Sequence, residues 1–107
     1  MKIIEDEARF DALQMHLTYE IIRAVHHELE RAKIAKGKLK DLTGAVAFQV
    51  CAVLDCSHEM KMEDGAAVRP VVTFAADEEI AEVISGGGVS DMHEYVYGAV
   101  DDYFDKS

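Results

Sequence analysis

The sequence predicts one mostly helical α+β domain that spans residues 1–107. Three observations support this fold class: two long stretches with apolar residues every three or four positions, a hairpin signal after them, and a third amphipathic stretch at the end. A chain of 107 residues fits one domain, because domains typically have roughly 100 to 150 residues. We therefore expect an antiparallel pair of long helices, a β-hairpin or small sheet, and a C-terminal helix packed over them.

The first stretch predicts a helix over residues 7–36. Its apolar residues recur at spacings of three and four and form one stripe. The acidic start and the basic end, from Arg31 to Lys36, match the helix dipole, and Gly37 is expected to end the helix. The stripe consists of Phe10, Leu13, Leu17, Ile21, Val25, Leu29 and Ala32.

The second stretch predicts a buried helix from about residue 39 to 56. Small alanine residues within it would let another element approach closely. A strand remains the alternative for residues 44–54, because the same apolar residues also alternate there. The residues that fit the helical period are Leu39, Leu42, Val46, Val50, Val53 and Leu54.

A hairpin is expected between the second and the last amphipathic stretch. Asp64-Gly65 is a favoured two-residue turn, and residues 71–74 are good strand formers. Pro70 cannot donate a hydrogen bond to a neighbouring strand, so it is expected at an edge or a bulge.

Two helices are expected after the hairpin, with three glycines between them. Asp77 is expected to cap a short helix over residues 78–85. Residues 86–88 are interpreted as a joint and not as a phosphate loop, because they follow a helix in this prediction and no lysine follows them. Ser90 is expected to cap the last helix. The apolar stripe of that helix consists of Met92, Tyr95, Val96, Ala99, Val100, Tyr103 and Phe104.

The formal net charge of −10 is unevenly distributed. Residues 1–54 carry eight acidic and eight basic side chains, whereas residues 55–107 carry thirteen acidic and three basic ones. The acidic half would repel nucleic acid. A protein partner, or self-association that involves the basic segment 31–40, is therefore favoured over a nucleic acid partner.

The composition indicates a cytoplasmic protein. No apolar run reaches the length of about 18 residues that a membrane span requires, and the acidic start differs from a secretory signal. Two cysteines are too few for the disulfide framework of a small secreted domain. We expect no membrane partner.

One face of the last predicted helix is the first candidate site. His93, Glu94, Tyr97 and Asp101 lie opposite the apolar stripe and are expected to form a contact face with another protein. In the alternative interpretation, His93, Glu94 and Tyr97 hold a small ligand.

A face of the first helix is the second candidate. His16, Glu20 and His27 lie on it, and imidazole with carboxylate at helical spacing can ligate a metal ion. Arg23, in the middle of the same face, disfavours a cation. A salt-bridged face in contact with water is the other interpretation.

Cys51, Cys56 and His58 resemble half of a metal site. In a helix the two cysteines lie about 140° apart around the axis, so they do not converge on one ion. Cys51 is expected to be a small buried residue. The sequence thus predicts no catalytic residue and no cofactor, and it leaves open whether either histidine group binds a metal.

The order helix, helix, hairpin, helix resembles that of winged-helix proteins, whose hairpin forms the wing. This resemblance implies DNA binding through residues 31–40, which the acidic hairpin argues against. We expect instead a small protein, not an enzyme, that acts through protein contacts or as a homodimer. Besides the charge asymmetry, this expectation rests on the methionine and tyrosine residues Met60, Met62, Met92, Tyr95, Tyr97 and Tyr103.

Overall fold

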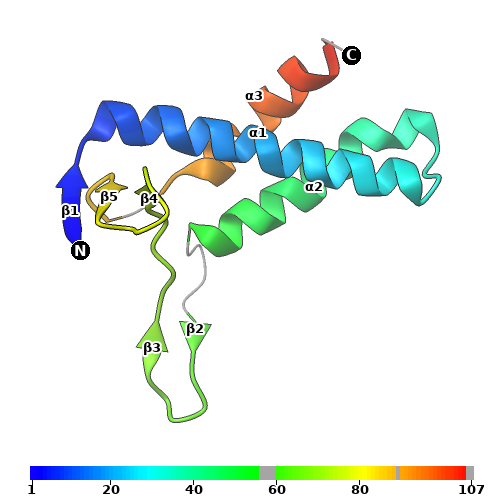
Figure 1. The fold of residues 1–107 in the computed structure, drawn as a ribbon. Coiled ribbons are helices and arrows are strands. Elements are labelled where there is room, and N and C mark those ends of the chain that lie inside the picture. Colours follow the sequence, from blue (N-terminus) through cyan, green and yellow to red (C-terminus); the bar gives the residue numbers. More distant parts are fainter. Residues whose placement is uncertain (56–59, 89, 106–107) are drawn as a thin grey trace.

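The computed structural model describes residues 1–55, 60–88 and 90–105, and it confirms the α+β fold (Figure 1). Three helices form most of it: α1 (Glu7–Arg31), α2 (Lys36–Leu54) and α3 (Met92–Asp105). α1 and α2 form the predicted antiparallel pair, and α3 packs against both. Residues 44–54 are helical, so the alternative strand is excluded.

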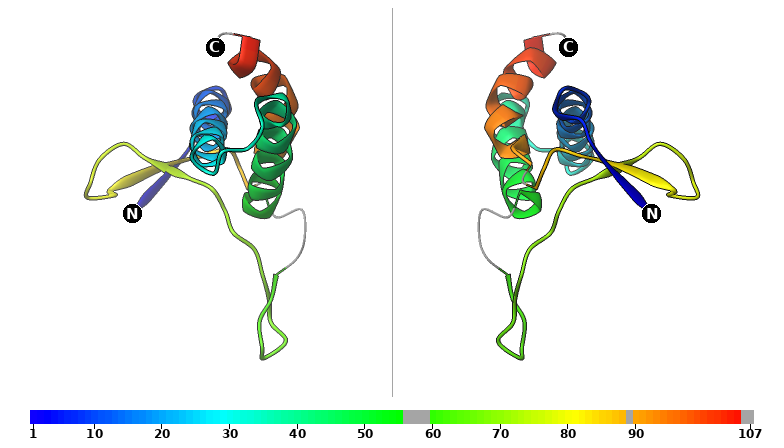
Figure 2. Two further views of the ribbon diagram at one scale, coloured as in Figure 1. Left: turned by 90° about the vertical axis from the view of Figure 1, so that its right-hand side faces the viewer. Right: turned by 90° about the vertical axis from the view of Figure 1, so that its left-hand side faces the viewer.

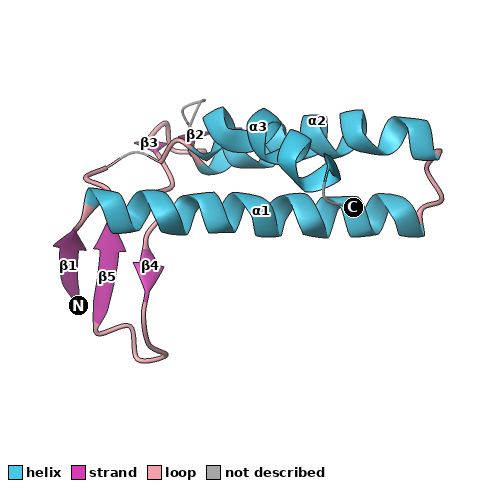
Figure 3. Cartoon of the chain, turned by 90° about the horizontal axis from the view of Figure 1, so that it is seen from above, coloured by secondary structure: helices cyan, strands magenta, loops and turns pink. Residues whose placement is uncertain are grey.

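Five short strands form two sheets. β1 (Lys2–Glu5) pairs in parallel with β5 (Glu82–Ser85), and β4 (Phe74–Ala75) pairs antiparallel with the other edge of β5. β2 (Met60–Lys61) and β3 (Ala67–Val68) form a separate antiparallel hairpin. α1 lies between the three-stranded sheet and the other two helices, and the hairpin projects away from the helices (Figure 2 and Figure 3).

α1 ends five residues before the predicted boundary at residue 36. The backbone N–H of Lys33 donates to the carbonyl of Glu30 at 2.9 Å, and that of Ile34 donates to the carbonyl of Leu29 at 3.2 Å. These two bonds form a Schellman motif, with Lys33 in the left-handed conformation at a φ of 60°. Lys33 therefore ends the helix, and the prediction that Gly37 ends it is wrong.

Replacing Lys33 with glycine is expected to stabilise the protein by about 0.5–1 kcal/mol, because glycine adopts a positive φ without a steric penalty from Cβ. Lys38→Gly, at an exposed position inside α2, is the matched control and should destabilise by about 1 kcal/mol. Urea midpoints compare the two variants with the parent. An unchanged or lower urea midpoint for Lys33→Gly would show that glycine does not stabilise the protein at this position.

The core lies where the three helices meet. In α1 the buried line is displaced by one position from the predicted stripe, and Gln14 and Thr18 share it with Phe10 and Ile22. Both polar side chains are satisfied locally: Gln14 Nε2 donates to Asp11 at 2.9 Å, and Thr18 Oγ1 donates to the carbonyl of Gln14 at 2.8 Å. Most of the predicted stripe is only half-buried, namely Leu13, Leu17, Ile21, Val25 and Leu29.

The stripe predicted for α3 is confirmed in its buried part. One side of this helix meets the core residues of α1 and α2. Its buried residues are Met92, Val96, Ala99 and Val100.

The hairpin turns at Asp64-Gly65 as predicted, but residues 62–66 connect its strands instead of two residues, and its second strand is not the predicted one. Gly65 has a φ of 87°, and the backbone N–H of Ala66 donates to Asp64 Oδ1 at 2.9 Å. Residues 71–74 lie outside the hairpin ladder, and only Phe74 belongs to a strand. Pro70 follows β3 and lies outside the ladder, as expected for a residue without an N–H.

The helix predicted over residues 78–85 is wrong, because residues 82–85 form β5. This strand places Lys2 opposite Glu82, a pairing between residues distant in sequence that no local pattern reveals. Asp77 does not cap a helix; its Oδ1 accepts a hydrogen bond from the backbone N–H of Ala81 at 3.3 Å and stabilises the turn before β5.

Candidate functional site

A buried carboxylate, that of Asp55, joins the end of α2 to the first turn of α3. Its side chain has no exposed surface. Oδ1 accepts a hydrogen bond from the hydroxyl of Ser90, and Oδ2 accepts one from the backbone N–H of His93 at 2.7 Å. Oδ2 also lies 2.5 Å from Nδ1 of the His93 ring. A carboxylate at a helix N-terminus satisfies a free N–H and favours the dipole. Asp55 thus caps α3, the role that was wrongly predicted for Ser90.

The side chains of Asp55, Ser90 and His93 do not form the arrangement that activates a serine nucleophile. In a serine–histidine pair the hydroxyl bonds to the imidazole, which takes its proton. Here the Ser90 hydroxyl and the His93 ring both bond to the carboxylate of Asp55 instead. The arrangement therefore links two helices, and the imidazole is not bonded to the hydroxyl.

The glycine segment 86–88 connects β5 to α3, so it follows a strand and not the predicted helix. Two of its glycines have φ values of 92° and 137°, which residues with a Cβ rarely adopt. A cavity of about 230 Å³ beside it is lined by Glu7, Asp11 and Asp91, and these carboxylates would repel a phosphate.

The predicted contact face on α3 is divided by contacts with α2. His93 is half-buried, and its ring lies 6.0 Å from the Phe48 ring, while Tyr97 stacks on Phe48 at 5.6 Å. The carboxylate of Asp101 pairs with Lys40 Nζ at 2.9 Å. Only part of this face is therefore open to a partner. The predicted members were His93, Glu94, Tyr97 and Asp101.

The predicted face on α1 is a salt-bridged surface. His16 Nε2 lies 3.7 Å from Glu20 Oε1, and the guanidinium of Arg23 bonds to the same carboxylate. Within the described ranges, no group of three histidine, cysteine or acidic side chains is placed to hold a metal ion. His27 is exposed and lines a shallow depression with Glu20 and Arg23.

Cys51 is fully buried, as predicted. Burial, together with the charge of Asp55, raises the pKa of the Cys51 thiol to about 11. The thiol is therefore protonated at neutral pH and is a poor nucleophile. Cys56 and His58, the other two members of the predicted group, lie outside the described residues.

His26 is a site residue that the sequence analysis did not single out. Its Nδ1 lies 2.8 Å from the hydroxyl of Tyr103, and its Nε2 lies 3.5 Å from Glu30 Oε1. The ring also packs against Phe104, with 4.8 Å between centroids. The buried residues of α1 recur every four positions up to Ile22, and His26 is the next position in this series. That spacing is the signal that could have identified His26 from the sequence.

An exposed apolar row runs along α2. α3 covers a different side of this helix, since Tyr97 packs against Gly44 and Phe48. The residues of the row fall within a sector of about 80° around the helix axis. We call them the α2 apolar row: Leu42, Val46, Val50 and Val53, with exposed fractions of 37%, 41%, 39% and 59%. The sequence predicted that these side chains are buried, and in a single chain they are not.

Comparison with known proteins finds no matching family model, and no curated protein or solved structure with significant similarity to this chain. Among the described residues, no helix combines the length and the apolar character that a bilayer crossing demands. The function therefore has to be argued from the surfaces of the molecule itself.

Proposed function

We propose that this chain is a non-enzymatic contact protein that works as a homodimer, with a second copy covering the α2 apolar row. The observation that carries the proposal is the row itself. A helix in a folded protein normally directs such a stripe toward a core. Here the stripe stays exposed, and no element among the described residues covers it.

The exposed area of the chain supports this proposal. One chain exposes 7317 Å², whereas a compact monomer of 11.9 kDa is expected to expose about 5,900 Å². The Cα radius of gyration is 15.7 Å, against about 13 Å for a compact domain of this length. The excess area, about 1,400 Å², exceeds the roughly 800 Å² that each partner buries in a standard interface.

The charge distribution favours contact between two copies through the α2 apolar row over contact through other surfaces. Each chain carries a net charge of −10, so two copies repel each other over most of their surfaces. The α2 apolar row contains no charged residue, and the basic start of α2, with Lys36, Lys38 and Lys40, adjoins it. A two-fold axis through the row would bring identical uncharged surfaces together.

The projecting hairpin gives further support. A two-stranded hairpin is at best marginally stable on its own in water. Its strands and the segment after them expose Met60, Met62, Val68 and Val71, with exposed fractions between 43% and 52%. A second copy would give these side chains an apolar surface, which accounts for the methionines that the sequence analysis noted.

The alternatives from the sequence have less support. A metal or ligand site on the predicted histidine faces would need side chains that converge, but His16 pairs with Glu20 along α1, and His93 pairs with Asp55 at the end of α2. DNA binding would need a basic hairpin. The hairpin turn carries Glu63 and Asp64.

Replacing Val46 with glutamate is expected to convert the dimer into a monomer, because it places two carboxylates at the centre of an uncharged interface. Ala45→Glu is the matched control, since it adds the same charge at an exposed position about 100° away around the helix. Light scattering coupled to gel filtration measures the mass of each variant. A Val46→Glu variant that keeps the mass of the parent dimer, or an Ala45→Glu variant that dissociates equally, would refute the proposed interface.

A further inference from the structure

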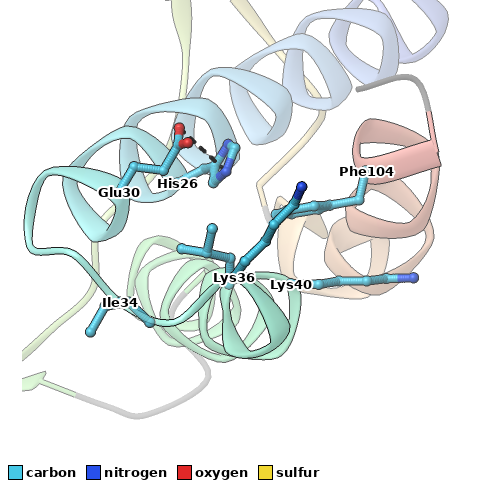
Figure 4. Close-up of a pocket in the computed structure, with 7 residues that line it drawn as sticks. His26, Glu30, Ile34, Lys36, Lys40 and Phe104 are labelled. Carbon is cyan, nitrogen blue, oxygen red and sulfur yellow. Dashed lines mark ion pairs between the residues drawn. The ribbon is translucent and has the colours of Figure 1, made fainter.

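A cavity of about 580 Å³ lies at the end of the helix bundle where the chain turns from α1 into α2. Small-molecule sites in proteins typically measure roughly 300–1,000 Å³. Figure 4 shows His26 and Glu30 of α1 across from Lys36 of α2 and Phe104 of α3. All three helices therefore contribute to one concave surface, which includes the His26 side chain described above.

The polar side chains around the cavity leave one charge uncompensated. Glu30 is engaged by His26 Nε2 at 3.5 Å, and Lys40 Nζ pairs with Asp101 at 2.9 Å. This pairing raises the pKa of Lys40. Lys36 has no ion pair with any residue that the structure describes. The cavity thus offers one ammonium group without a counter-ion.

His26 also lines the cavity. Its Nδ1 lies 2.8 Å from the hydroxyl of Tyr103, and its Nε2 lies 3.5 Å from Glu30 Oε1. The carboxylate of Glu30 would repel a second negative group on a ligand, so the site suits a ligand with a single negative group.

The rest of the cavity wall is apolar. Ile34 lies in the turn between the helices, Leu39 is buried on α2, and the ring of Phe104 packs edge-on against Tyr103 with 5.2 Å between centroids. An apolar wall with a few placed polar groups is typical of sites for organic molecules. The turn between α1 and α2 is basic, because residues 31–40 carry five basic and no acidic side chains, whereas Asp41, Asp101 and Asp105 lie near Lys40 on the other side of the cavity.

We propose that this cavity binds a small organic monoanion, such as a carboxylate with an aromatic or branched apolar body. The anionic group pairs with Lys36 Nζ, and the apolar body lies against Ile34, Leu39 and Phe104. A hydroxyl or amine on the ligand would have Glu30 as its acceptor. This site does not depend on the proposed dimer, since none of its residues belongs to the α2 apolar row.

Titration of the ¹⁵N-labelled protein with phenylacetate tests the proposal. We expect saturable amide shifts at Ile34, Leu39 and Phe104, with a Kd on the order of 1–10 mM for so small a probe. Lys36→Met keeps the apolar stem and removes the charge, and it should weaken binding about fivefold or more. Lys38→Met is the matched control, because it removes an exposed charge of the same helix turn that does not line the cavity.

Two further comparisons make the outcome decisive. The uncharged analogue phenylacetamide should bind more weakly than phenylacetate, and the Val46→Glu variant should bind phenylacetate as the parent does. No saturable shift up to about 20 mM phenylacetate, equal binding of the amide, or equal weakening by Lys36→Met and Lys38→Met would overturn the proposal. None of these results would bear on dimerisation, which is measured by mass.

Discussion

Replacing Asp55 with alanine should destabilise the protein by about 3 kcal/mol, among the largest effects expected of any single substitution in this chain. The carboxylate is fully buried and accepts hydrogen bonds from the hydroxyl of Ser90 and from the backbone of His93. Its removal leaves these donors without a partner and leaves α3 without its cap. Urea unfolding, followed by circular dichroism, measures the loss.

Two companion variants define the origin of this effect. Asp41→Ala removes an exposed carboxylate from the same helix and should change the free energy of unfolding by less than about 0.5 kcal/mol. Ser90→Ala removes one of the hydrogen bonds to Asp55 and should cost about 1 kcal/mol. If Asp55→Ala were no more destabilising than Asp41→Ala, the link between α2 and α3 would not contribute to stability.

Gly86→Ala should destabilise the protein by about 2 kcal/mol, although it adds a single methyl group. A Cβ at this position would lie 2.8 Å from Cε2 and 2.9 Å from Cγ of Phe10. The ring cannot move aside easily, because it is buried and packs edge-on against Phe74 with 5.6 Å between centroids. The joint between β5 and α3 therefore depends on the absence of a side chain as well as on backbone freedom.

Gly98→Ala is the matched comparison, with the opposite expected sign. Gly98 lies in α3, and apart from the backbone of this helix a Cβ there would meet no atom of the described residues within 4 Å. Alanine in a helix is favoured over glycine by about 0.8–1 kcal/mol, so this variant should be more stable than the parent. The two urea midpoints should move in opposite directions, and a shift of both to lower denaturant would contradict the packing described around Phe10.

The helices were largely predictable from the sequence, because the helical period is a local signal. α2 and α3 begin and end within a few residues of their predicted limits. The end of α1 was not predictable in this way, because Lys33 adopts a conformation that usually requires glycine. The same period placed Leu42, Val46, Val50 and Val53 on one face, but periodicity alone does not reveal whether that face meets the core or another molecule.

The three-stranded sheet could not be predicted, because its pairs are distant in sequence. β1 is only four residues long, and its partner β5 lies about 80 residues later in the sequence. Short apolar runs such as Val83-Ile84 fit a strand or a helix equally well. The glycines after them were correctly singled out as a joint, but the element before them was misassigned.

The candidate sites show the same limit. Asp55 was not among the candidate residues, because nothing near it in sequence indicates that it meets Ser90 and His93. The cavity at Lys36 is formed by three helices and has no local motif. His26 was accessible in principle, since it lies four residues after Ile22, but a histidine on a half-buried face is more often structural than functional.

The mass of the parent protein in solution tests the central proposal most directly. Sedimentation equilibrium at about 5, 50 and 200 µM protein gives the number of chains without a column or a label. We expect twice the 11.9 kDa of one chain at the higher concentrations, with dissociation only on dilution. A mass of 11.9 kDa at every concentration would contradict the account, because the α2 apolar row would then be exposed in the working form of the protein.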